Sequence, residues 1–290
     1  MKKKITGLTK TTNIIDYCAK QVKLLGSKSA AIKAINAGKL RINGKLANLN
    51  SRLTNGDVLE LTLEQSKSKS SIKGLPDVPI IFEDDYLIVI NKPGGIAVNG
   101  NRNKTVENAL KQQATKSIQS DALSHPIAAH RLDVPTKGLV ILAKTKTALI
   151  RLNKAFQAGK IDKEYMAVVH GKLEEEGRIT LPIQGKKAET RYITTRIVPS
   201  KVFDHLSLVR LQLITGRTHQ LRIHLNSINH LIVGDKQYAG EQKTILGKGL
   251  FLCACRLSFI HPITKDRLSI TIDPPARFKK ILDREEARFK

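Results

Sequence analysis

Apolar and polar residues alternate along much of the chain after Pro76, in short runs typical of half-buried β-strands. Such strand-like runs lie within residues 79–98, 138–145, 163–171, 179–213, 251–262 and 266–275. Helices are expected between them at residues 106–115, 146–158 and 218–228. Long groups of strands with few intervening helices predict an α+β fold with a mostly antiparallel sheet.

The first 65 residues have an organisation of their own. An alanine-rich helix is predicted from residue 30 to Gly38, after the polar start Ser27-Lys28-Ser29. Two short strand-like runs follow, with Asn43-Gly44 and Asn55-Gly56 as turn signals. We therefore expect a small domain at 1–65, a Ser/Lys-rich flexible linker at 66–75 and a larger domain at 76–290.

The charge of the chain narrows the choice of partner. Fifty Lys and Arg against 25 Asp and Glu give a formal net charge of +25. An excess this large opposes compaction, and it favours a polyanionic partner such as nucleic acid or an anionic membrane surface. No apolar run approaches the roughly 20 residues that span a bilayer. A nucleic-acid partner is therefore expected, and a membrane is not.

Cysteine usage and the start of the chain indicate a reduced compartment. Three cysteines are too few for a disulfide framework and odd in number; they are Cys18, Cys253 and Cys255. The last two stand two residues apart in an apolar run, as core residues of a strand do, although such a pair is also half of a metal site. The basic start lacks the apolar stretch of a signal peptide. A cytoplasmic protein is expected.

A first segment able to carry chemistry runs from residue 128 to 145. His130, Arg131 and Asp133 precede the turn Pro135-Thr136-Lys137-Gly138, and an apolar strand follows. A carboxylate at such a turn can lie at the mouth of a cleft on a rigid support. An Asp beside an Arg also forms structural ion pairs or caps turns. Metal ligation by His130 and Asp133 would lack a third ligand at recognisable spacing.

A second such segment is ITGRTHQLRIHL, residues 214–225. A helix from Thr218 would put His219, Arg222 and Asn226 on one face. The opposite, core-facing side would hold Leu221, Leu225 and Ile228. Arg217 near the helix start suits a phosphate. The alternative is an ordinary amphipathic helix with a solvated basic face.

Together with further motifs, these segments resemble the RluA family of pseudouridine synthases. The motifs are NKPGGIAV, HRLD-x-x-T-x-GL-x-x-LAKT, KEY, TGRTHQLRIHL with GDKQYAG, and RLSFIHP, in that order. The first 65 residues resemble the small alpha-L RNA-binding module of a ribosomal protein and several RNA-modifying enzymes. The resemblance implies an isomerase that converts uridine to pseudouridine in structured RNA, with no metal and no organic cofactor.

By motif position, the resemblance assigns three catalytic residues. Asp133 matches the nucleophilic aspartate, Arg222 the arginine that pairs with it, and Tyr165 the tyrosine that lies against the target base. A neighbouring arginine fork keeps a carboxylate ionised and oriented. Whether Asp133 attacks C1′ of the sugar, attacks C6 of the base or abstracts the 2′ proton stays open.

The expected RNA contacts surround these residues and extend over the N-terminal module. Arg131 is expected to fill the space left by the extruded base or to hold a flanking phosphate. In the larger domain the expected contacts are Lys92, His130, Arg131, Thr136, Lys137, Arg217, His219 and Gln220. In the N-terminal module they are Lys28, Lys39, Arg41 and Lys45, which would add phosphate affinity that falls with salt.

Two positions depart from the family pattern, and they bear on substrate preference. Lys137 takes a usual serine position, and Cys253 stands where a histidine is common. Large-subunit ribosomal RNA is the first expected substrate and transfer RNA the second. A monomer is the default.

Two other functions are weighed against this one. The first is a non-catalytic RNA-binding or ribosome-assembly factor that retains the fold, although degenerate relatives often lose the nucleophile or its partner. The second is a glycoside-acting enzyme, which needs two carboxylates flanking one cleft. No second candidate for such an acid lies in these motifs.

Overall fold

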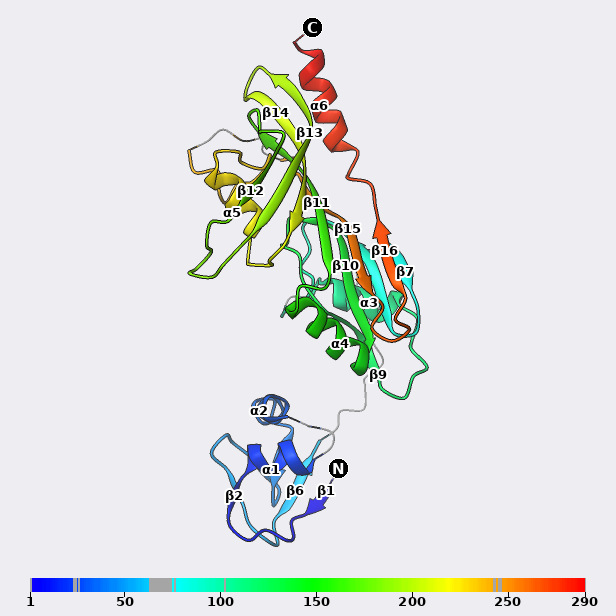
Figure 1. The fold of residues 1–290 in the computed structure, drawn as a ribbon. Helices are drawn as coiled ribbons and strands as arrows, with labels where there is room; N and C mark the ends of the chain where they lie inside the picture. Colours follow the sequence, from blue (N-terminus) through cyan, green and yellow to red (C-terminus); the bar gives the residue numbers. More distant parts are fainter. Residues whose placement is uncertain are drawn as a thin grey trace. The chain divides into compact units, whose positions relative to one another are not determined.

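A computed structural model describes residues 2–22, 25, 27–62, 75, 77–101, 103–241, 244 and 247–289. The chain divides into two compact units, Met1–Ser71 and Ile72–Lys290. The linker expected at 66–75 lies outside the described residues except for Leu75. Each unit has a sheet and an apolar core of its own (Figure 1).

The N-terminal unit is a small α+β fold. Its four-stranded sheet has the order β1-β6-β3-β4, and a separate pair is formed by β2 and β5. The strands are β1 (Lys2–Lys4), β2 (Thr12–Asn13), β3 (Leu40–Ile42), β4 (Lys45–Leu46), β5 (Arg52–Leu53) and β6 (Val58–Leu61). The expected alanine-rich helix is α2 (Lys28–Asn36), and it begins there because the Ser27 hydroxyl accepts a hydrogen bond from the Ala30 N–H.

A second helix of this unit, α1 (Ile14–Gln21), was not predicted from the sequence. Its buried residues Ile14, Tyr17 and Cys18 stand at helical spacing, and they pack into the core of the unit. Asn13 caps the helix, because its side chain accepts a hydrogen bond from the Ile15 N–H at 2.8 Å. The signal was therefore present in the sequence but was only eight residues long.

The larger unit is built on a ten-stranded sheet. The strands lie in the order β12-β13-β14-β11-β15-β10-β8-β7, with β16 beside β15 and β9 beside β10. Only β10 and β15 pair in parallel within the described part of this sheet, which confirms a mostly antiparallel α+β fold. The strands are β7 (Ile80–Glu83), β8 (Leu87–Lys92), β9 (Ala122–Ala128), β10 (Lys137–Thr145), β11 (Asp162–His170), β12 (Glu176–Ile179), β13 (Thr190–Ser200), β14 (Asp204–Leu213), β15 (Leu252–Ile260) and β16 (Arg267–Thr271).

Strand β10 is the centre of the core of this unit. Its side chains alternate between two apolar clusters, as the two-residue period of a strand requires. Val140 and Leu142 belong to the cluster that contains the buried side of α3 (Val106–Gln113). Leu139 and Ile141 belong to the cluster that contains the buried side of α4 (Lys146–Gln157). The sheet is thus covered on both faces where it carries the site.

Two helices depart from the sequence prediction. Helix α5 (Gln220–Ser227) begins at Gln220 and not at Thr218, because His219 adopts the left-handed conformation with φ of 55°. Helix α6 (Arg277–Ala287) was not predicted, although its buried Phe278, Ile281, Leu282 and Glu285 recur at helical spacing. The Arg196 side chain on β13 ties α6 to the sheet with ion pairs of 2.7 Å to Asp283 and 2.8 Å to Glu286.

Candidate active site

Asp133 lies in the loop between β9 and β10, and the backbone of this loop is tightly held. The Asp133 carbonyl accepts a hydrogen bond from the Thr136 N–H at 3.0 Å, and this bond closes the turn. The next carbonyl, that of Val134, accepts from the Gly95 N–H at 2.8 Å. The NKPGG segment, which begins in the last two residues of β8, therefore supports the Asp133 loop.

Lys92 completes this support from inside the protein. Its ammonium donates to the carbonyls of Pro93 at 2.9 Å, Ile96 at 2.9 Å and Val134 at 3.1 Å. Burial lowers the pKa of Lys92 to about 8, and the charge of Asp133 acts in the opposite direction. Lys92 was expected to contact RNA, but it is fully buried and its three donors are used by the chain.

Gly138 fixes the position of the loop against the parallel strand. Its φ is +117°, and an added Cβ would lie 2.2 Å from the carbonyl oxygen of Ala254 on β15. No other residue type fits so close an approach. The turn after Asp133 is therefore anchored where β10 and β15 run side by side.

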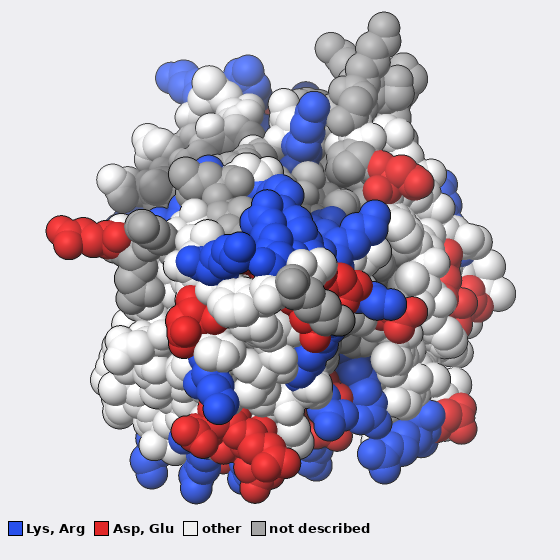
Figure 2. All heavy atoms as spheres, turned by 90° about the horizontal axis from the view of Figure 1, so that it is seen from above, with Lys and Arg blue, Asp and Glu red and all other residues white. Residues whose placement is uncertain are grey.

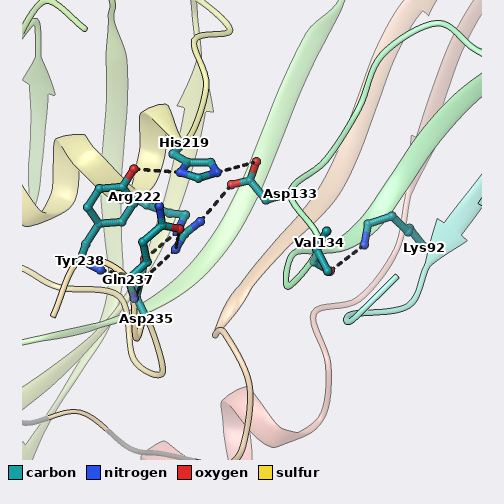
Figure 3. A network of polar contacts seen from close by, with 8 residues as sticks. All are labelled: Lys92, Asp133, Val134, His219, Arg222, Asp235, Gln237 and Tyr238. Carbon is teal, nitrogen blue, oxygen red and sulfur yellow. Dashed lines mark hydrogen bonds and ion pairs between the residues drawn. The ribbon is translucent and has the colours of Figure 1, made fainter. Parts of the chain in front are cut away.

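The carboxylate of Asp133 faces two groups from the α5 region (Figure 3). Arg222 approaches one oxygen at 3.5 Å, and the His219 Nε2 approaches the other at 3.7 Å. Both distances are longer than those of tight charge-assisted hydrogen bonds. The Asp133 side chain keeps 24% exposure, so its oxygens remain accessible from the cleft.

Arg222 makes its tight contacts with Asp235, which the sequence analysis did not identify. Two hydrogen bonds of 2.7 Å join the guanidinium to the two oxygens of this fully buried carboxylate. A third, of 3.1 Å, reaches Gln237, and the guanidinium lies 4.9 Å from the centre of the Tyr238 ring. Burial alone would lower the pKa of Arg222, but the hydrogen bonds and charge of Asp235 outweigh it and raise the pKa.

The expected pair of Arg222 with Asp133 is present at 3.5 Å, but the shorter contacts of the guanidinium are those with Asp235. Asp235 belongs to GDKQYAG, a motif that was noted without a role for its aspartate. It is a second carboxylate close to Asp133, joined to it through Arg222. Because Asp235 is buried and bound on both oxygens, it is not a free second acid of the kind a glycosidase uses.

The His219 ring is oriented by a hydrogen bond to Tyr238. Its Nδ1 is hydrogen bonded to the hydroxyl of Tyr238 at 2.8 Å, which leaves Nε2 directed at Asp133. The left-handed backbone of His219 brings the ring into this position. Tyr238 thus contacts both groups that flank Asp133 (Figure 3).

Tyr165 lies on β11 and lines the same cleft as Asp133. It is 6% exposed, and burial, followed by the charge of Asp133, raises its pKa above the usual value. Its phenol therefore stays protonated at neutral pH. A stacking surface for a base is the role that this environment supports, and proton abstraction by the phenolate is not.

The cleft has a volume of about 900 Å³ and is bordered by cations. Arg131, Lys163 and Arg217 all contribute to its lining, together with an apolar part formed by Phe156 and Leu252. Such a combination suits a single-stranded nucleic acid, because the cations can bind its phosphates and the aromatic surface can stack on its bases. On the face seen from above, at the end where α6 lies in Figure 1, Lys and Arg side chains gather near the centre (Figure 2).

Other residues that were expected to contact RNA also have structural partners. Thr136 and Gln220 are each 2% exposed. The Gln220 amide holds the Thr215–Arg217 loop by donating to the Glu189 carbonyl at 2.8 Å and by accepting from the Arg217 N–H at 3.0 Å. The Gln220 side chain therefore shapes the cleft from within the protein, and little of Thr136 is exposed to it.

His130 also supports the Asp133 loop. Its Nε2 accepts a hydrogen bond of 3.0 Å from the Ile141 N–H, and its ring packs on Phe156 with a centroid distance of 4.6 Å. Burial lowers the pKa of His130 to about 3, with a smaller contribution from Lys163. It is therefore a neutral residue. Arg131 and Arg217 are exposed and Lys137 is half-buried, in keeping with their expected positions.

The basic residues of the N-terminal unit lie mainly on its surface. Lys28 is paired with Asp16 at 2.7 Å, and Arg41 donates to the Gly44 carbonyl at 2.9 Å. Lys45 is exposed on β4, and Lys39 is half-buried beside β3. These side chains remain candidates for phosphate contacts of this unit.

The described residues also bear on metal and membrane binding. No group of three or more His, Cys, Asp or Glu side chains that could hold a metal ion is found among them. No helix in the same part of the chain is long and apolar enough to cross a membrane.

Comparison with known proteins agrees with the site. The model of the RNA pseudouridylate synthase family matches residues 86–227. The chain is 36% identical over 216 residues to the dual-specificity RNA pseudouridine synthase RluA of Pasteurella multocida, with 69% of this chain and 94% of that protein covered. It is 30% identical over 294 residues to ribosomal large subunit pseudouridine synthase D of Haemophilus influenzae, with 91% and 88% covered.

A solved structure shares the fold as well. Human RNA pseudouridylate synthase domain containing 4 superimposes with a TM-score of 0.58 at 26% identity, covering 71% of this chain and 92% of that chain. Fold, cleft and relatives together define an RNA pseudouridine synthase, an isomerase that acts on RNA. Within that class the chain belongs to the RluA family.

Proposed function

We propose that this enzyme isomerises uridine in large-subunit ribosomal RNA, with transfer RNA as the second substrate class, and that Asp133 is its nucleophile. The choice of ribosomal RNA is supported by the ribosomal large subunit pseudouridine synthase D of Haemophilus influenzae, which the chain matches over 91% of its length. The single observation that carries the role of Asp133 is its accessible carboxylate at a basic cleft, between Arg222 and His219.

The loose contacts of Asp133 suit a nucleophile. Isomerisation breaks the N-glycosidic bond, turns the base and rejoins it through C5, so the carboxylate must bond to the substrate or to one of its protons and then leave. Contacts of 3.5 and 3.7 Å keep the carboxylate in place without tight charge-assisted hydrogen bonds. Tight pairing with Arg222 would oppose the reaction, and Asp235 prevents it by binding that guanidinium.

Tyr165 and Arg131 serve the base and its surroundings in this proposal. The protonated ring of Tyr165 provides a flat surface in the cleft against which the extruded uracil can lie. Arg131 is exposed at the opening beside Asp133, where it can occupy the space that the base leaves in the RNA stack.

The substrate is tested by mapping pseudouridine in total RNA from cells with and without the gene, using a chemical that marks pseudouridine selectively. We expect one or a few sites in large-subunit ribosomal RNA to vanish in the deletion strain and to return with the unchanged gene. If the lost sites lie in transfer RNA, the second substrate class is correct. Persistence of every site, with no turnover by the purified enzyme on that RNA, would contradict the proposal.

The nucleophile is tested with purified Asp133→Asn. This change removes the negative charge at constant size, so turnover should disappear while the folded state and RNA binding persist. Asp162→Asn is the control, because Asp162 is an exposed aspartate at the start of β11 that does not line the cleft. Pseudouridine formation by Asp133→Asn at the control's rate would exclude the assigned mechanism.

The proposed RNA-binding role of the N-terminal unit is tested in the full chain. Replacing Lys39, Arg41 and Lys45 together by Gln removes three positive charges. If each contacts a phosphate, the slope of log affinity against log salt should decrease by about 2 to 3. Fluorescence anisotropy with labelled ribosomal RNA fragments at several salt concentrations measures this slope. An unchanged slope would remove the case for this unit as an RNA clamp.

A further inference from the structure

Lys163 is a half-buried cation in the cleft, and no anion among the described residues pairs with it. It stands on β11, two residues before Tyr165, and lines the same cleft as Asp133. The described residues offer its ammonium no hydrogen bond and no carboxylate, only the Phe156 ring, whose centroid lies 5.9 Å away. Burial lowers the pKa of Lys163, so the position costs free energy in the unbound enzyme.

Two other buried lysines of this unit have internal acceptors. Lys144 forms an ion pair of 2.8 Å with Glu83 and also donates to the Asp84 carbonyl. Lys92 donates to three carbonyls. The contrast indicates that the partner of Lys163 arrives with a ligand, since a buried ammonium without any partner is unfavourable.

The space in front of Lys163 is open to such a ligand. A Cβ added to Gly216 would lie 3.6 Å from the Lys163 Nζ, so the missing side chain at Gly216 leaves the ammonium accessible. Arg131 and Arg217 are exposed and line the same cleft. The local charge is therefore positive around Lys163, and it selects for an anion.

Resting on the proposed function, we propose that Lys163 binds a phosphodiester of the RNA strand next to the target uridine. A uridine whose base lies against Tyr165 brings its flanking phosphates into the same cleft, because phosphodiesters join each nucleoside of the strand to its neighbours. An ammonium binds a phosphate as a compact point charge. Residues two apart on a strand share a face, so β11 would hold the base with Tyr165 and the phosphate with Lys163.

The first test measures binding without requiring turnover. Lys163→Met is compared with Lys160→Met, which removes the charge of a nearby exposed lysine outside the cleft. The probe is a fluorescein-labelled uridine decamer, titrated at several salt concentrations. We expect Lys163→Met to weaken binding about tenfold or more and to lower the salt slope by about 0.7, with Lys163→Arg close to the unchanged protein. Lys160→Met should have a much smaller effect.

The second test separates binding from a structural role. Because the ammonium is desolvated without a partner, Lys163→Met should melt no lower than the unchanged protein. In single-turnover reactions on total RNA from the deletion strain, it should raise the half-saturating enzyme concentration about tenfold and leave the maximal rate within about threefold. An unchanged salt slope, or a lower melting temperature with unchanged binding, would overturn the phosphate contact.

These outcomes are independent of the proposed activity. If the unchanged enzyme binds the decamer but forms no pseudouridine in any RNA, the proposed function fails, while the salt slopes of the three Lys163 proteins still decide the contact. If turnover is normal and the slopes are equal, the proposed function stands and the phosphate contact fails.

Discussion

The pair of Arg222 and Asp235 makes a sharp prediction for Asp235→Asn. This change keeps the size of the side chain but removes its charge and turns one of two acceptors into a donor that faces the guanidinium. Arg222 is only 4% exposed, so its charge stays buried with one good contact instead of two. Breaking a buried ion pair from one side costs about 3–5 kcal/mol.

That cost converts into a measurable change. For a unit of this size, about 1 kcal/mol corresponds to roughly 2–4 °C in melting temperature, so Asp235→Asn should melt roughly 6–20 °C lower. Released from Asp235, the guanidinium turns to Asp133, the carboxylate already 3.5 Å away. Tight pairing there should lower the maximal rate about tenfold or more, through a transition state at least ~1.4 kcal/mol higher.

Thermal melting and single-turnover pseudouridine formation test both parts of this reasoning. Asp133→Asn is the control, because it should abolish turnover yet change stability by less than about 1 kcal/mol, as expected for a partly exposed pair with long contacts. The double variant Asp235→Asn with Arg222→Met should regain stability without regaining activity, since it removes the buried charge. An Asp235→Asn protein with unchanged melting or unchanged turnover would refute the argument.

Two further predictions concern the support of the Asp133 loop. Burial holds the pKa of His130 at about 3 in the folded chain, whereas the unfolded chain binds a proton at this residue below about pH 6.5. The free energy of unfolding therefore falls as the pH drops from about 6.5 toward 3. His130→Asn should flatten this fall between pH 7 and 5 in urea unfolding, and parallel profiles would contradict it. Gly138→Ala should prevent folding or separate β10 from β15, whereas Gly95→Ala, with φ of +93° and open space around it, should cost only about 1–2 kcal/mol. Equal effects in melting experiments would mean that the contact with Ala254 is unimportant.

The apolar pattern of the sequence predicted most strands of the larger sheet and most helices of the described residues, but it missed β9. Strand β10 was predicted from a continuous apolar run and helix α4 from apolar residues at helical spacing. Helix α1 is only eight residues long, and α6 is strongly charged, with Lys and Arg between its buried positions. In both cases packing against a sheet overrides weak local signals.

The three predicted catalytic residues lie together, but the tight partner of Arg222 was not predicted. Motif positions identify Asp133, Tyr165 and Arg222, and the structure places all three at one cleft or its wall. Which carboxylate Arg222 binds depends on how the segment after α5 folds back, and Asp235 is 13 positions away in sequence. The burial of Lys92 is likewise a property of packing, since a lysine before Pro-Gly-Gly reads as an exposed turn.

The way in which the Asp133 loop is fastened has a consequence for selectivity. Lys92, Gly95 and Gly138 fix that loop to the core of the sheet before any RNA arrives. Because this loop is already fixed, the RNA and not the enzyme must change conformation when the two bind. The enzyme would then select a uridine by the free energy needed to bend the surrounding RNA and unstack the base. A weakly stacked base or a strained loop would favour a site as much as its base sequence does.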